Sequence, residues 1–407
     1  MKEKTSKQNM ILFCLTFLLS AFGYEFIFFI MTLYVFNLSN SAIQVSIFTA
    51  LTFIPKFISP FFGGLADRFS REKVLGIANL AACVLLPGLA YTQKLAIIYP
   101  LWFLISVDLM VIMTVRGTLL AELIPSNNYK AGNSTMLVLS NGARLLAPLI
   151  GGAATLVFSM KALVYTVCVI YLVAAVLSFF LKLKPVAVTS TTGKQKGYWA
   201  SGFKTIMRIP VLRYLESVSF LWRLFLGLQI SLFVVYVESF LHGNDAQYGY
   251  FIAFSTLGSI LGSLAGSKMG KRWNASILIP IGLGLHYASF AVLGLTDQLW
   301  LACGIVFFSF FAFYGTLVHM HTLRDRHTPS ELRGRVYGMV TALNTPSTII
   351  SMLVGGALVR VIGVNRVLFI AGMLAVVSLL AATLAQPNWE RETGISGTAL
   401  NETKIHI

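Results

Sequence analysis

The chain has 407 residues, of which 57% are hydrophobic and 11% are charged, and its net charge at pH 7 is +16. Soluble domains carry about 25% charged residues, so this composition excludes an ordinary soluble globular protein. Apolar runs recur from end to end, and each is long enough to cross a hydrocarbon layer of roughly 30 Å. The sequence therefore predicts an all-α polytopic membrane protein.

Twelve membrane spans are predicted, six on each side of a polar linker. They cover residues 10–36, 43–65, 74–92, 96–120, 132–157, 162–181, 212–238, 247–267, 275–296, 299–323, 334–359 and 367–385. The first run is too long for the core of a signal peptide, so we expect a retained helix. The predicted parts are an N-terminal six-helix bundle (1–182), a cytoplasmic linker (183–211), a C-terminal six-helix bundle (212–385) and a cytoplasmic tail (386–407).

Positive charge is distributed unevenly around these spans. With the N-terminus inside, most of the 31 Lys and Arg fall in predicted cytoplasmic segments, and only Lys94, Lys161, Arg360 and Arg366 fall in predicted outer loops. This asymmetry follows the positive-inside rule and predicts that both termini are cytoplasmic. The basic balance then reflects topology and attraction to anionic membrane lipids, without nucleic acid as a partner. We expect the bacterial cytoplasmic (inner) membrane as the location.

A compact charged turn follows the second span. Gly63 and Gly64 end that span, and Asp67, Arg68 and Arg71 follow within a few residues. As the cytoplasmic link between spans two and three, this turn would place Asp67 at a helix C-terminus, where the macrodipole disfavours an anion. Asp67 therefore needs a partner, either the neighbouring arginines or the N-terminal end of another helix. The alternative is a solvated turn that only helps to orient the protein.

The second part of the linker, Tyr198 to Arg208, is expected to be helical. Its apolar residues near one helical face are Trp199, Phe203, Ile206 and Met207. Lys204 and Arg208 lie elsewhere on the same helical projection. This pattern predicts a short amphipathic helix on the membrane surface.

The second half of the chain repeats features of the first in the same order and at nearly constant spacing. The matched positions are Ser267 with Asp67, Pro329 with Pro125, and Gly355-Gly356-Ala357 with Gly151-Gly152-Ala153. A duplicated six-helix unit implies a pseudo-twofold axis along the membrane normal, with a central pathway between the halves.

These motifs resemble a known family. The Gly63-x-x-x-Asp67-Arg68-x-Ser70-Arg71 pattern is similar to the loop 2–3 signature of the major facilitator superfamily, which usually has glycine where Ser70 stands. Asn40-Ser41-Ala42, Pro55 and Pro329-x-x-x-Arg333-Gly334-Arg335-Val336 resemble its macrolide-efflux and enterobactin-exporter branch. The resemblance covers essentially the whole chain and implies the major facilitator fold. It also implies a latch that closes the cytoplasmic side, in which Asp67 contacts the start of span eleven at Arg333, Gly334 and Arg335.

Span five contains a second resemblance. The run Ala147-Pro148-Leu149-Ile150-Gly151-Gly152 is similar to a Gly-Pro-x-x-Gly element that accompanies proton-coupled exporters in this superfamily, with Ala147 in place of the first glycine. The structural alternative is a helix kinked at Pro148 and packed closely at Gly151 and Gly152.

Ionisable residues inside the predicted spans are costly to bury and are therefore usually functional or paired. The acids are Glu25, Asp108 and Glu216, and the bases are Lys56, Arg116, Arg144 and Arg223. Glu25 is the first candidate proton carrier and Asp108 the second, since burial favours a neutral carboxyl group. The alternative for Glu25 is a permanent ion pair with Lys56 or Arg144.

Arg144 shares a helical stripe with Asn141 and is a candidate to bind an anionic group of the substrate or to pair with Asp108 or Glu25. We expect proton binding to compete with substrate or with an arginine pair, which would couple the two fluxes. His286 in span nine can titrate near neutrality. Its alternative is a packed, hydrogen-bonded core residue.

No nucleotide-binding loop, nucleophile elbow or zinc motif occurs in the sequence, so we expect neither an enzyme nor a cofactor or bound metal. The energy source should then be an ion gradient. We predict a proton-coupled exporter of an amphipathic small organic molecule, such as a macrolide-like drug or a siderophore, acting as a monomer by rocker-switch alternating access. The alternatives are proton-coupled uptake, and a receptor or structural protein without transport.

Overall fold

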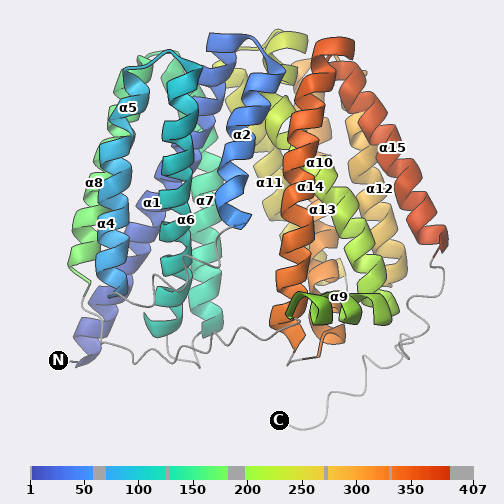
Figure 1. Cartoon of the computed structure of the whole chain (residues 1–407), viewed down its shortest axis with the longest axis horizontal. Coiled ribbons are helices and arrows are strands. Elements are labelled where there is room, and N and C mark those ends of the chain that lie inside the picture. The colour runs from blue at the N-terminus through green and yellow to red at the C-terminus, as the bar shows by residue number, and fades with distance from the viewer. Residues whose placement is uncertain are drawn as a thin grey trace. The chain divides into compact units, whose positions relative to one another are not determined.

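The computed structural model describes residues 2–57, 70–123, 129–181, 198–269, 274–329 and 332–385, and these ranges are helical almost throughout (Figure 1). Within them, 11 helices are long and apolar enough to cross a membrane, and a shorter apolar helix covers Ala42–Lys56. The described residues contain no strand. The predicted all-α polytopic class is confirmed.

The first half of the chain begins with the long helix α1, which ends where Asn40 takes a positive φ of 46°. Asn tolerates this left-handed conformation better than most residues, so it suits the tight turn into α2. The helices are α1 (Lys2–Ser39), α2 (Ala42–Phe57), α4 (Arg71–Leu85), α5 (Pro87–Ala90), α6 (Leu95–Leu123), α7 (Tyr129–Thr155) and α8 (Met160–Phe179). Predicted span three is divided because Pro87 begins a new helix, α5.

The second half begins with a short helix at the place where the sequence predicts one. Its elements are α9 (Tyr198–Arg208), α10 (Pro210–Val235), the π-helical segment η2 (Tyr236–Phe240), α11 (Asp245–Met269), α12 (Ala275–Leu293), α13 (Leu299–His327), α14 (Arg333–Ile362) and α15 (Val364–Ala385). Helix α13 continues beyond the predicted end of span ten at residue 323. This extension places the buried residue Arg324 within α13.

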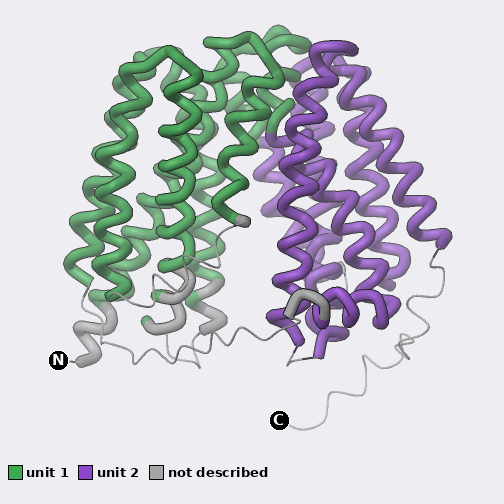
Figure 2. The backbone as a smooth tube through the Cα atoms, in the orientation of Figure 1, with its two compact units in different colours: residues 1–192, 231–253 green, residues 193–230, 254–407 purple. Residues whose placement is uncertain are grey.

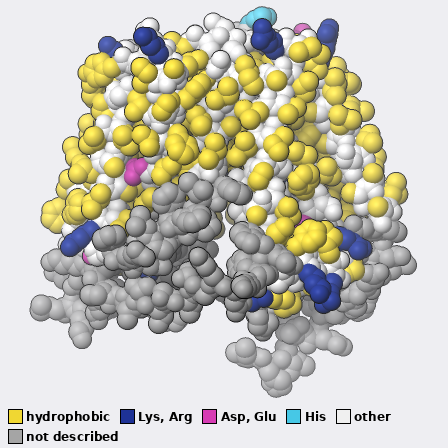
Figure 3. All heavy atoms as spheres, viewed as in Figure 1, with side chains coloured by type: hydrophobic (Ala, Val, Ile, Leu, Met, Phe, Trp, Pro, Cys, Tyr) yellow, Lys and Arg dark blue, Asp and Glu magenta, His cyan; other side chains and the backbone are white. Residues whose placement is uncertain are grey.

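The chain divides into two compact units (Figure 2). Unit 1 comprises Met1–Thr192 and Ser231–Ala253, and unit 2 comprises Gly193–Ile230 and Phe254–Ile407. By contacts, the end of α10, η2 and the beginning of α11 therefore group with the N-terminal helices. On the face drawn in Figure 3, hydrophobic side chains cover most of the described surface, as lipid contact requires.

In unit 1, α1 packs against α7 and α8, α4 packs against α6 and α8, and α2 packs against α6. The α2–α6 contact is aromatic, because the rings of Phe48 and Trp102 lie 4.5 Å apart between centroids. Trp102 also donates its Nε1 hydrogen to Thr52 Oγ1 at 2.9 Å. The buried indole thus satisfies its only donor while it fills the core.

In unit 2, α12 packs against α13 and α15, and α14 packs against α9 and α15. Glycines bring α11 close to α13, since a Cβ atom at Gly258 would lie only 2.2 Å from the carbonyl oxygen of Phe307. Gly262 makes the same approach to the carbonyl oxygen of Phe311. Small residues at such positions let membrane helices gain van der Waals contact at backbone distance.

Candidate functional site

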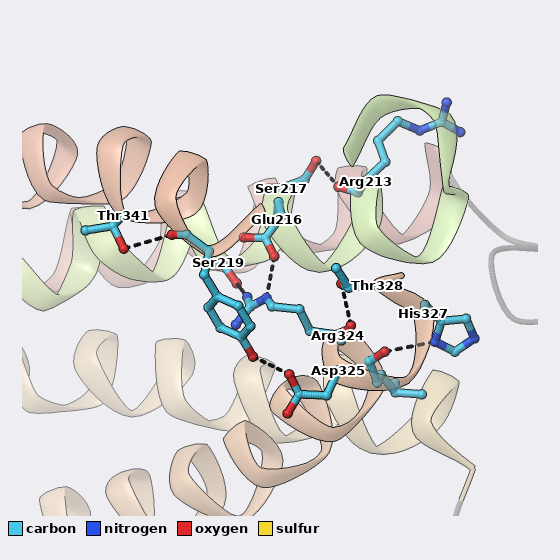
Figure 4. Close-up of polar contacts among 11 residues, drawn as sticks. Arg213, Glu216, Ser217, Ser219, Arg324, Asp325, His327, Thr328 and Thr341 are labelled. Atoms are coloured by element: carbon cyan, nitrogen blue, oxygen red, sulfur yellow. Dashed lines mark hydrogen bonds and ion pairs between the residues drawn. The ribbon is translucent and has the colours of Figure 1, made fainter. Parts of the chain in front are cut away.

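A buried ion pair joins α10 to α13 in unit 2 (Figure 4). Arg324 donates from Nε to Glu216 Oε1 at 2.5 Å and from Nη2 to Ser219 Oγ at 3.0 Å. The two charged side chains are only 6% and 9% exposed. Removing two ions from water is costly, and a short charged bond with an added hydroxyl partner offsets that cost.

A second set of contacts ties the end of α13 to the start of α14. Tyr337 donates its hydroxyl hydrogen to Asp325 Oδ1 at 2.6 Å, and Arg333 donates to the Asp325 carbonyl oxygen at 3.2 Å. Thr328 closes α13 by donating to the Arg324 carbonyl oxygen at 2.6 Å. The buried pair therefore lies in a region where α10, α13 and α14 are all fixed.

Arg223 lies further along α10. Its Nε atom is buried and has no hydrogen-bond partner among the described residues. Its guanidinium carbon lies 4.3 Å from the centroid of the Trp222 ring, and Trp222 in turn stacks on Phe313 at 4.9 Å. Glu216 and Arg324 are close enough to act electrostatically on Arg223.

We call Glu216, Ser219, Arg223 and Arg324 the arginine cluster. Among the described residues it holds two guanidinium groups and one carboxylate, and the carboxylate is bonded to Arg324. One positive charge in the cluster is thus left without a bonded counter-charge inside it. A guanidinium whose Nε donor has no partner, next to aromatic rings, is suited to bind an anionic group attached to an apolar body.

Two basic residues of unit 1 lie close enough to Glu25 to act on it electrostatically. Arg144 on α7 and Lys56 on α2 are the cations that act on the Glu25 carboxyl group of α1. The Lys56 ammonium also lies 3.8 Å from the centroid of the Phe53 ring. Asn141, half-buried, precedes Arg144 on α7. We call Glu25, Lys56 and Arg144 the Glu25 cluster.

Asp108 on α6 differs from Glu25 in its surroundings. Its Oδ2 atom is buried, and among the described residues it has no hydrogen-bond partner. A buried carboxylate is costly unless water, a cation or a proton satisfies it. Arg116 lies further along α6, and its side chain is outside the part of the chain that the structure describes.

His286 on α12 is fully buried and bonded through both ring nitrogens. Its Nε2 atom lies 2.9 Å from Gln229 Nε2, and its Nδ1 atom lies 2.8 Å from Ser309 Oγ. Both partners are neutral, which is the arrangement of a packed core histidine. Among the described residues, no group of three or more His, Cys, Asp or Glu is placed to hold a metal ion.

The motif of span five lies in α7, which runs through Pro148 to Thr155. A Cβ atom at Gly152 would lie 2.7 Å from the Asp245 carbonyl oxygen, and one at Gly249 would lie 2.5 Å from the Pro148 carbonyl oxygen. Gly151 faces the Phe29 ring, which would lie 3.0 Å from an added Cβ atom. These residues thus hold α7 close to the beginning of α11 and to α1.

The charged turn after span two falls largely outside the described residues. Gly63, Asp67 and Arg68 are among the residues that the structure does not describe. Arg71 begins α4. The expected partners at the start of α14 are described: Gly334 is exposed, and Arg335 donates to Ser201 Oγ of α9 at 3.3 Å. The latch between Asp67 and this end of α14 stays a prediction.

Two features of these sites were missed from the sequence. Arg324 was assigned to a cytoplasmic segment, although the buried stripe of Phe313 and Met320 continues onto it at helical spacing. Glu238 in η2 shares a side-chain hydrogen bond with Asp245 at the start of α11, and its Oε1 atom is buried without a partner among the described residues.

Relatives by sequence are transporters. The model of the Major Facilitator Superfamily matches residues 13–352. The chain is 24% identical over 376 residues to YfiS, an uncharacterized MFS-type transporter of Bacillus subtilis strain 168, with 88% of this chain and 89% of that protein covered. It is also 24% identical over 340 residues to the enterobactin exporter EntS of Shigella flexneri, with 78% of this chain and 77% of that protein covered.

Solved transporter structures share the fold. The nucleoside transporter NupG matches with a TM-score of 0.75 at 14% identity, covering 93% of this chain and 98% of that one. A bacterial homologue of the iron transporter ferroportin matches with a TM-score of 0.72 at 16% identity, covering 95% and 98%. The predicted fold is thereby confirmed. Because the family model spans most of its length, the chain belongs to the major facilitator superfamily and is a multi-pass membrane transporter.

Proposed function

We propose that this transporter is a proton-coupled exporter of an anionic, amphipathic small organic molecule, with a siderophore as the first candidate. The observation that carries the proposal is the arginine cluster, in which Arg223 presents a buried Nε atom without a bonded partner among the described residues. Transport itself follows from family membership. The charge and the apolar character of the cargo are inferred from this chain's own residues.

The cluster favours an anion for two reasons. Glu216 is already bonded to Arg324, whereas the buried Nε atom of Arg223 has no hydrogen-bond partner among the described residues. Oxygen anions match the guanidinium fork better than they match a lysine. The adjacent ring of Trp222 offers a flat apolar surface, which suits an aromatic or macrocyclic body. The name of the relative EntS, an enterobactin exporter, supports a siderophore over a macrolide-like drug.

Proton coupling is assigned to acids of unit 1. In the Glu25 cluster, a proton on Glu25 would remove the negative charge that Arg144 and Lys56 face. Arg144 would then be free to exchange its partner, which links protonation to a rearrangement of α1 against α7. Asp108, whose Oδ2 atom is buried without a bonded partner among the described residues, is the second candidate carrier.

Uptake and a receptor without flux are the competing functions. Direction depends on the coupling stoichiometry and the gradients, so uptake uses the same site. A receptor binds its ligand but does not exchange it across a bilayer. Counterflow in proteoliposomes separates these classes, since only a transporter accelerates the exchange of labelled against unlabelled cargo. The proposed exporter is expected to show counterflow with enterobactin.

Replacement of Arg223 by glutamine tests the cargo site. A hydrogen bond to a charged group contributes about 1.5–3 kcal/mol, so we expect counterflow affinity for enterobactin to fall roughly 10- to 100-fold in Arg223→Gln. The matched control is Arg213→Gln, which removes an exposed arginine from the same helix and should leave affinity unchanged. Equal affinities of Arg223→Gln and wild type would contradict the assignment.

A further inference from the structure

Helix α9 has one face built against α14. Gly202 meets the backbone of α14 so closely that a Cβ atom there would lie 2.5 Å from the Arg335 carbonyl oxygen. Ile206 is buried against Val336 and Val340. Together with the Arg335–Ser201 hydrogen bond, these contacts fix α9 on the first turns of α14.

The opposite side of α9 is amphipathic and uncovered. Phe203 is 43% exposed and Met207 is 45% exposed, one helical turn apart on the same edge. Lys204 and Arg208 are exposed on the adjoining edge. Figure 3 shows hydrophobic and basic side chains side by side over α9. No acidic residue interrupts this 11-residue helix.

The position of α9 relative to the membrane follows from its connection to α10. Helix α9 ends at Arg208, and the membrane-spanning helix α10 begins at Pro210. The join is short and hydrogen-bonded, because Ile209 donates to the Thr205 carbonyl oxygen and Arg213 donates to the Ile209 carbonyl oxygen. Helix α9 runs across the ends of α10 and α14 (Figure 1). It must therefore lie at a boundary of the bilayer.

We propose that α9 is a docking helix for the anionic surface of the membrane, and that this docking positions the N-terminal turns of α14. Phe203 and Met207 enter the acyl boundary, and Lys204 and Arg208 reach lipid phosphates. Each basic residue near an anionic leaflet strengthens such attraction about fivefold. The position that α9 takes on the membrane constrains α14 through Gly202 and Ile206, because helices packed at backbone distance move together.

This inference does not depend on the cargo. It makes the transporter sensitive to the lipid composition of its membrane, since the turns of α14 that α9 contacts include Arg335 and Val336. The competing occupant of the same face is a partner protein. Anionic lipid is favoured because the exposed charges are all positive and the helix adjoins a membrane span.

The test uses the full-length chain in nanodiscs, with its four native cysteines replaced and a single spin-labelled cysteine at position 207. Power-saturation EPR compares contact of the label with oxygen, which partitions into lipid, and with a water-soluble nickel chelate. Nanodiscs of phosphatidylcholine with phosphatidylglycerol are compared with phosphatidylcholine alone. Amide hydrogen exchange of residues 333–340 is measured in the same samples.

In the anionic nanodiscs we expect the label to be lipid-exposed and residues 333–340 to exchange several-fold more slowly than in phosphatidylcholine. The double variant Lys204→Gln with Arg208→Gln should lose both lipid-dependent differences. The control pair Arg360→Gln with Arg366→Gln, exposed side chains near the end of α14 and the start of α15, should keep both. All four substituted side chains are exposed, so folding is expected to be retained.

A label that stays in water in both lipids would overturn the proposal and leave the face to a protein partner. A label that inserts equally with and without phosphatidylglycerol would overturn the role of anionic lipid. Insertion without any change in exchange at residues 333–340 would overturn the positioning of α14. None of these outcomes affects the cargo proposal, because no cargo is present.

Discussion

At the scale of single residues, the clearest result is the contrast between Arg324 and Arg223. Arg324 is bonded to Glu216 and Ser219, whereas the Nε atom of Arg223 is buried with no bonded partner among the described residues. Pairing explains the first arginine as a structural element. The unpartnered Nε atom makes the second arginine the better candidate for binding cargo.

The Glu216–Arg324 pair should dominate local stability. In Glu216→Gln, Arg324 is left as a buried cation without a counter-charge, and we expect the free energy of unfolding to fall by about 3 kcal/mol. Arg326→Gln, which removes an exposed charge from the same helix, should change it by less than about 0.5 kcal/mol. Unfolding in mixed micelles, followed by tryptophan fluorescence, measures both.

A double-mutant cycle gives the pair's coupling directly. Glu216→Gln combined with Arg324→Gln removes both charges of the pair, so neither is left without its partner, and the double variant should be less destabilised than the sum of the single variants. Additive losses would contradict a direct ionic interaction in the folded protein.

Some of the buried ionisable residues could be predicted from the sequence, but their partners could not. Glu216 and Arg223 were identified by their positions inside apolar runs. The partner Arg324 was missed, because hydropathy places a span boundary where charges begin, whereas the helix and its buried stripe continue past that point. Partner choice depends on how helices far apart in the sequence pack, which residue patterns do not contain.

At the scale of helices, the order and type of the elements were predicted from apolar runs, while several of their ends were not. Pro87 divides span three, and η2 extends α10 by a π-helical turn. The short helix α9 was predicted at the residues where it occurs. The close contact of α9 with α14 was not predicted, because this contact depends on the absence of a side chain at Gly202.

Two glycines in unit 2 should respond oppositely to alanine. At Gly227 an added Cβ atom would lie 1.9 Å from Ser351 Oγ and 2.3 Å from the Thr348 carbonyl oxygen. Gly227→Ala should therefore destabilise the protein by about 1–3 kcal/mol. At Gly304 no atom lies within 4 Å of such a Cβ atom, so Gly304→Ala should be neutral or stabilise by up to about 1 kcal/mol.

The midpoints of thermal unfolding of the two alanine variants in detergent test this prediction. Equal midpoints for Gly227→Ala and Gly304→Ala would show that α10 and α14 are not packed at backbone distance.

At the scale of the whole molecule, composition was sufficient for the membrane class, the repeat suggested two halves, and the superfamily was inferred from the resemblance of its motifs. Composition and the repeat predicted two six-helix halves, and the chain's contacts group residues 231–253 with the N-terminal helices. The close approach of Gly152 to Asp245 and of Gly249 to Pro148 is consistent with that grouping. The charged turn at Gly63, Asp67 and Arg68 lies outside the described residues, so its role as a latch stays a prediction.

The most direct test of the central claim, proton-driven export of an anionic cargo, is enterobactin flux into proteoliposomes with an acidic lumen. We predict accumulation in the lumen as protons leave, and its loss on addition of a protonophore. Glu25→Gln and Asp108→Asn should remove most of the pH-driven component, while Asp297→Asn, at an exposed acid, should retain it. Flux that is independent of the pH gradient, or full pH-driven flux in both variants of the buried acids, would contradict the account.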